Sequence, residues 1–103
     1  MKFQISTDPR TQIQMHSEML TRVRSAVHDV ATYRDRLLPE LQRHEALMQS
    51  MRASEPRSPE TRKQIAEVAK MRQTRKKLRQ QELCLKNQER RLQERISWLQ
   101  TGC

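Results

Sequence analysis

Apolar residues recur three and four positions apart from Thr11 to Met51, for almost six heptads. This spacing is typical of one face of an α-helix that packs along a partner helix, and the row of residues on that face is called the seam here. We therefore predict a first helix over residues 9–53. Nine of its twelve seam positions are apolar, and the full seam is Ile13, His16, Leu20, Val23, Val27, Val30, Arg34, Leu37, Leu41, His44, Met48 and Met51.

The start of this helix is marked by Asp8, which can cap free amide groups, and by Pro9, which suits the first helical position. Residues 1–7 are expected to form an extended or disordered lead-in. Pro39 lies inside the helix, where a proline costs roughly 3 kcal/mol if the strain is not relieved. It falls on the face that points away from the seam, so we expect a kink there and not an end.

A second helix is predicted over residues 59–100, after a connecting loop at 54–58 that breaks the pattern with Pro56. Ser58 is its expected cap, Pro59 its first residue, and Gly102 the glycine that follows its end. Seven of its twelve seam positions are apolar, and the full seam is Thr61, Gln64, Val68, Met71, Arg75, Leu78, Glu82, Leu85, Glu89, Leu92, Ile96 and Leu99.

The two seams match when the chain folds back at the loop. Leu41 then faces Met71 and Leu20 faces Leu92, and the residue numbers of every facing pair add to 112. Each pair joins complementary heptad positions, as antiparallel packing requires. The predicted fold is all-α, an antiparallel coiled-coil helical hairpin that forms one domain over residues 1–103. A third helix or a partner could complete it to a bundle.

Eight of the 24 seam positions are polar, and five of them locate the weak points of the predicted packing: His16, Arg34, His44, Glu82 and Glu89. Arg34 is expected to face Leu78, one layer from Glu82, where an ion pair would set the register more than it would add stability. On this view Arg34→Leu should raise the melting temperature. Glu89, opposite Val23, has no evident partner.

The histidines and cysteines offer little chemistry. His16 and His44 are separated by about 42 Å of helix, so they cannot share a metal or a substrate, and packed seam histidines are the simpler interpretation. Cys84 and Cys103 have no CxxC spacing and read as free thiols of a reducing compartment, which predicts a cytoplasmic protein. We expect no catalytic site, no metal and no cofactor.

Composition limits the size of the core. The chain has 103 residues, 34% of them apolar, a mean hydropathy of −1.02 and one glycine. This is too little apolar material for a layered globular core, but it is enough for one narrow seam. Apolar runs are two or three residues long, so no membrane span is expected.

The net charge of +9 is concentrated in the second helix. From Pro56 onward there are 13 basic and 5 acidic residues, against 8 and 7 before it. The stretch 70–79 contains no acid and six cations, namely Lys70, Arg72, Arg75, Lys76, Lys77 and Arg79. This imbalance points to an acidic protein, nucleic acid or anionic lipid as partner, with a solvated helix face as the plain alternative.

Nucleic acid is the less favoured of these partners. Leucines recur every seven residues from Leu78 to Leu99, as in a basic-region leucine zipper, but the asparagine that this class places in its basic region is missing between Glu60 and Lys86. Tyr33 and Trp98 lie far from the basic stretch, so no platform for stacking bases is expected.

Several short motifs resemble one known family. Asp8-Pro9-Arg10, the run 12–17 and the run 19–23 are similar to the opening of the tubulin-specific chaperone A family, also called tubulin-binding cofactor A. Met51-Arg52-Ala53 and Arg62-Lys63-Gln64 resemble later parts of the same pattern. The chain differs by seven extra residues between these matches and by lacking the family's third helix.

The resemblance implies a non-enzymatic chaperone that binds and holds β-tubulin before heterodimer assembly. The residues expected to bind the partner are Arg72, Arg75, Lys76, Lys77 and Arg79, together with Arg22, Met19 and Ala26. The alternative is a basic coiled-coil adaptor or structural subunit of a larger protein or nucleic-acid assembly. A homodimer stays open, because Met19, Ala26, Leu38 and Leu47 widen the apolar stripe of the first helix.

Overall fold

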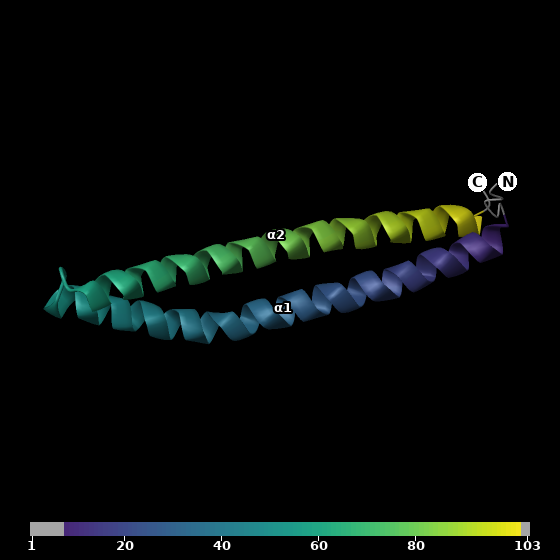
Figure 1. Ribbon diagram of the computed structural model, residues 1–103. Coiled ribbons are helices and arrows are strands. Elements are labelled where there is room, and N and C mark those ends of the chain that lie inside the picture. Colours follow the sequence, from purple (N-terminus) through teal and green to yellow (C-terminus); the bar gives the residue numbers. More distant parts are fainter. Residues whose placement is uncertain (1–7, 102–103) are drawn as a thin grey trace, which may run out of the picture. The chain divides into compact units, whose positions relative to one another are not determined.

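The computed structural model describes residues 8–101, which form two helices and no strand (Figure 1). α1 spans Pro9–Ser54 and α2 spans Pro59–Thr101. Both helices begin and end within one residue of the predicted positions, and the all-α helical hairpin is confirmed. The predictions for residues 1–7, Gly102 and Cys103 lie outside the described residues.

Asp8 caps α1 as predicted. Its Oδ1 accepts a hydrogen bond from the Arg10 amide at 3.1 Å, and its Oδ2 accepts one from the Thr11 hydroxyl at 3.3 Å. The Asp8 carbonyl accepts the first helical bond, from the Gln12 amide at 3.1 Å. Pro9 follows at the first helical position, where no donor is needed, so the sequence defines this helix end locally.

The connection between the helices is closed by Ser58 and Thr61. Ser58 Oγ accepts the Thr61 amide at 3.2 Å, which makes Ser58 the cap of α2. Thr61 is fully buried, and its hydroxyl donates to the Glu55 carbonyl at 2.5 Å. The first seam residue of α2 therefore also fastens the loop that precedes the helix.

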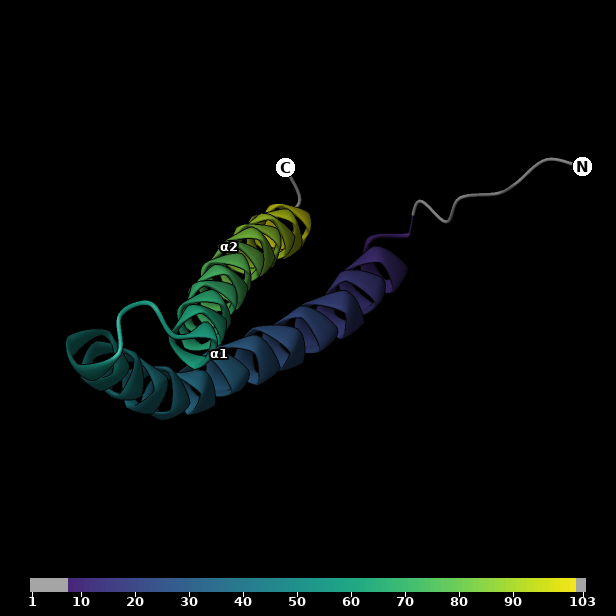
Figure 2. The same cartoon turned by 60° about the vertical axis from the view of Figure 1, so that its left-hand side comes forward.

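Pro39 does not end α1. The helix runs from Pro9 to Ser54 with the proline inside it, and Figure 2 shows it as one continuous helix. Pro39 is exposed, as expected for a position that points away from the seam. The carbonyl that it leaves without a helical donor can be hydrated from this side.

The described chain divides into two units, and each is an antiparallel pair of helical segments. One unit joins residues 8–28 of α1 with residues 83–101 of α2. The other is residues 29–82, which form a hairpin through the connecting loop. Its core is Leu41, Met48 and Val68, with Met71 packed against them, so the predicted contact layer of Leu41 and Met71 is present.

Burial follows the predicted seams closely. In α2, the twelve predicted seam residues are buried or half-buried and every other residue is exposed. In α1, all twelve predicted residues are likewise buried or half-buried. Six more α1 residues join them on the flanks, namely Gln12, Ala26, Ala31, Thr32, Leu38 and Glu45. The core itself is thin, since only Leu20, Leu41, Met48 and Val68 are buried apolar residues of the described chain.

Candidate functional site

The polar seam residue Arg34 makes the ion pair with Glu82 that the sequence analysis considered. Its guanidinium donates directly to a carboxylate oxygen of Glu82, which is 7% exposed, and also contacts Asp35 at 3.4 Å. The long arginine side chain reaches the next layer, whereas the facing-pair rule places it opposite Leu78. This contact reverses the expected effect of Arg34→Leu on the melting temperature, because the substitution would take a charge partner from the buried Glu82.

Two further ion pairs between the helices involve at least one residue beside the seam. Arg24 Nε lies 3.3 Å from Glu89 Oε1 in the unit of residues 8–28 and 83–101. Arg72 lies 3.2 Å from Glu45 Oε2 in the unit 29–82. Sequence reasoning missed Arg24 and Glu45 as partners. Both follow a seam residue by one position, so counting charges on the heptad flanks in the antiparallel register would have found them.

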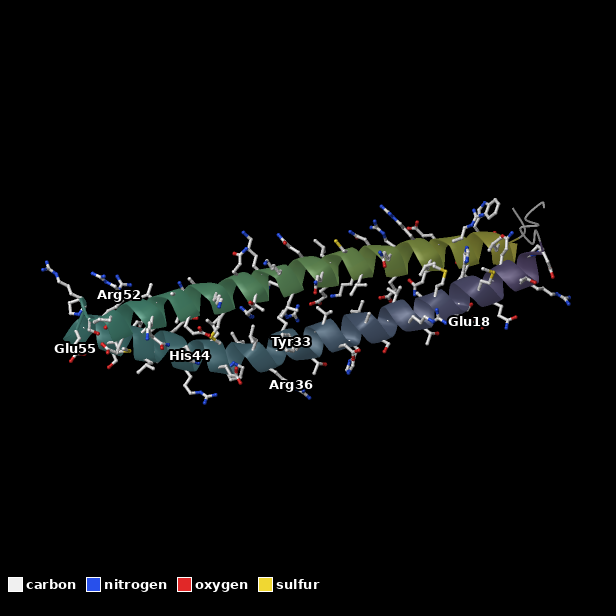
Figure 3. All side chains as sticks on the ribbon, viewed as in Figure 1. Glu18, Tyr33, Arg36, His44, Arg52 and Glu55 are labelled. Atoms are coloured by element: carbon white, nitrogen blue, oxygen red, sulfur yellow. The ribbon has the colours of Figure 1, made fainter. Side chains whose placement is uncertain are left out.

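The seam histidines are packed side chains and lie in different units. Nδ1 of His44, which is labelled in Figure 3, accepts a hydrogen bond from Gln64 Nε2 at 2.8 Å, and the His44 carbonyl accepts from the same nitrogen at 3.2 Å. Nδ1 of His16 is buried and makes no hydrogen bond to residues 8–101. Within that part of the chain, no three His, Cys, Asp or Glu side chains gather as a metal site, and Cys84 is an exposed free thiol.

The unit 29–82 carries a groove on its surface, called the basic groove here. Its volume is about 360 Å³ and it is lined by Leu41 from α1 and by Arg72, Arg75, Lys76 and Arg79 from α2. Counted from Arg72, the other three cations follow at three, four and seven positions, so all four lie on one face of α2. No acidic residue is among the described residues that line the groove.

The groove gathers four of the eight residues predicted to bind a partner. Lys77 is exposed on α2 but does not line it. Arg22, Met19 and Ala26 belong to the other unit; Arg22 and Met19 are exposed and Ala26 is half-buried. The predicted set is therefore divided among the basic groove, the exposed Lys77 of α2 and three α1 positions of the other unit.

The four cations of the groove have different surroundings. Arg72 is held at its edge by the ion pair with Glu45, and Lys76 and Arg79 are exposed. Arg75 occupies a seam position and is half-buried, and its Nε is buried without a hydrogen bond to any described residue. Buried polar groups normally have a partner, so Arg75 is the donor in this site whose hydrogen bonding is least complete.

The two aromatic residues of the described chain, Tyr33 and Trp98, are not among the residues that line the groove. Trp98 sits in the other unit, where the Arg95 guanidinium carbon is 4.8 Å from its ring centroid. This cation–π contact joins residues one helical turn apart on α2. The groove itself offers charge and hydrogen-bond donors, but no ring on which a base could stack.

Among residues 8–101, neither helix has a stretch long and apolar enough to cross a membrane. Comparison of the chain with protein-family models, with curated proteins and with solved structures finds no match.

Proposed function

We propose that this chain is a non-enzymatic binding protein that captures an acidic protein partner on the basic face of α2 and holds it. β-Tubulin before heterodimer assembly is the partner that the family resemblance favours. The observation that carries the proposal is the basic groove, in which four cations from one helix face converge with no acid in the described lining.

Capture by such a face needs no chemistry on the partner. The chain's net charge of +9 attracts an acidic surface over a distance and raises the rate of encounter. Three arginines in the groove then offer planar guanidinium groups, each able to bind a carboxylate through two parallel hydrogen bonds. A chain that attracts an acidic partner and then binds its carboxylates can hold that partner without a chemical reaction.

The test is capture of purified β-tubulin by the immobilised full chain at low and at moderate salt. The charge-reversed variant Arg72→Glu/Lys76→Glu/Arg79→Glu is expected to lose capture. A matched control reverses three exposed cations outside the groove, Arg36→Glu/Arg43→Glu/Arg91→Glu, and should retain most of it. If the unaltered chain binds nucleic acid but not tubulin under the same conditions, the proposal is wrong.

A second candidate is an adaptor or structural subunit that is completed by another helix. It is favoured by apolar side chains outside the seam, since Met19 is 48% and Leu47 50% exposed on α1. A chain with a thin core and such flanks would gain stability from a covering partner. Circular dichroism would then show partial helix for the isolated chain and a gain in helix when the partner is added.

A further inference from the structure

The basic groove has a length and a spacing that fit a particular kind of ligand. Arg72 and Arg79, at its two ends, are separated along α2 by about 10 Å, at about 1.5 Å per residue. In an extended peptide, side chains on alternate residues point the same way and lie about 7 Å apart. Two carboxylates on alternate residues therefore fit within the length of the groove.

We propose that the basic groove is a binding site for a short, extended acidic peptide segment with carboxylates on alternate residues, and that Arg75 is its innermost anchor. This inference rests on the proposed function and specifies how the partner is recognised. The segment belongs to the partner protein, and its carboxylates bind Arg75, Lys76 and Arg79.

Arg75 is the residue of the basic groove that also belongs to the seam. Its seam position draws the side chain toward the helix interface, and its Nε is buried without a hydrogen bond to residues 8–101. A carboxylate that enters the groove brings acceptors to this guanidinium, with small side-chain adjustments. The anchor thus gains a hydrogen bond that the described chain does not give it.

Glu45 of α1 pairs with one of the cations that line the basic groove. Its carboxylate already binds Arg72 at 3.2 Å, in the geometry that a peptide carboxylate would adopt at that end of the groove. The pair is partly exposed, so exchange with an external carboxylate costs little. Glu45 is therefore an internal competitor for one end of the site, and its removal should tighten binding.

The lining favours an acidic peptide over nucleic acid. The groove is lined by cations and Leu41, with no aromatic ring for a base, and its volume of about 360 Å³ is that of a small ligand pocket. A nucleic-acid backbone is followed by an extended track of cations, whereas this site is one short cluster. Arginine forks match the planar carboxylate group in particular.

The experiment measures fluorescence anisotropy of a labelled eight-residue peptide of alternating glutamate and alanine, titrated with the full-length chain. The same peptide with glutamine in place of glutamate serves as the uncharged probe and should not bind. Lys76→Gln/Arg79→Gln should weaken binding of the acidic peptide about tenfold, because two charge-assisted contacts are lost. The matched control Lys63→Gln/Lys70→Gln removes the same charge at exposed positions outside the groove and should change Kd less than about threefold.

A variant that should tighten peptide binding, and not weaken it, completes the test. Glu45→Gln should tighten peptide binding about threefold, while Glu40→Gln, an exposed acid of the same helix, should leave Kd nearly unchanged. Circular dichroism establishes that each variant has the helix content of the parent chain. Equal effects of the groove and control pairs would mean diffuse electrostatic attraction and would overturn the inference.

A competition experiment with single-stranded DNA that carries the same number of charges distinguishes an acidic peptide from nucleic acid as the ligand of the groove. Tighter, groove-dependent binding of the DNA would also overturn the inference. The outcome is separable from the tubulin test. Tubulin capture with no peptide binding would reject the groove as the site and leave the holding function, and groove-dependent peptide binding without tubulin capture would reject tubulin as the partner.

Discussion

Replacing Arg34 by leucine is expected to destabilise the chain, because Arg34 donates to Glu82 across the seam of the unit 29–82. The side chains are 23% and 10% exposed, so the pair lies between the buried and the surface class. Removing one partner costs about 3–5 kcal/mol for a fully buried pair and an exposed pair contributes about 0–1 kcal/mol. We expect a loss of about 2 kcal/mol for Arg34→Leu, which for a chain of this size lowers the melting temperature by about 8–16 °C.

Thermal unfolding followed by circular dichroism measures this loss, and a double-mutant cycle assigns it to the pair. Arg34→Leu/Glu82→Leu replaces both charges by apolar groups in an apolar seam and is expected to recover the stability of the parent or to exceed it by about 1–4 kcal/mol. A melting temperature that rises in the single variant Arg34→Leu would refute the reasoning. It would mean that solvent screens the pair more than its exposure indicates.

Four other changes test the remaining parts of the structure by thermal unfolding. Val68→Ala should cost roughly 2 kcal/mol, since Val68 is 1% exposed, whereas Leu83→Ala, at a residue 64% exposed, should change stability by less than about 0.5 kcal/mol; equal effects would contradict the assigned core. Ser58→Ala removes the cap of α2 and should cost about 1 kcal/mol, and an unchanged melting temperature would show that the cap is dispensable. Arg24→Ala should cost less than about 1 kcal/mol and the loss should vanish at high salt, because its ion pair is largely exposed; a large, salt-independent loss would point to a packing role. Arg75→Leu should raise the melting temperature by a few degrees, corresponding to about 1 kcal/mol, while it weakens binding of the acidic peptide; a fall in both would mean that Arg75 supports the fold.

The hairpin could be predicted almost completely from the sequence because its determinants are local and periodic. Asp8 and Ser58 are caps whose role is visible in the residues that follow them, and both act as predicted. Leu41 and Met71 meet because a seven-residue period in each helix leaves one antiparallel register that pairs apolar with apolar positions. These signals need no knowledge of how side chains reach across the interface.

The contacts outside that period could not be predicted in the same way. Arg34 lies opposite Leu78 by the pairing rule, and the ion pair considered one layer away, with Glu82, forms because the arginine side chain is long enough to reach that layer. Glu45 and Arg24 lie beside the seam, where helix position alone does not decide between solvent and a cross-helix partner. Side-chain conformations decide which residues line the basic groove. The sequence therefore indicated which residues are basic, but not which four of them would line it.

Arg75 links the fold to the proposed function. The second seam has an apolar residue at seven of twelve positions, and Arg75 is the one of its polar members with a buried nitrogen that no described residue satisfies. A leucine there would extend the core, which is thin enough to benefit from every apolar side chain. Because a seam arginine weakens the packing and the same side chain lines the basic groove, this position is explained best by binding. Arg75 is thus both the residue that weakens the packing of the second seam and a residue that lines the basic groove. An acidic segment that binds Arg75 would therefore stabilise the hairpin.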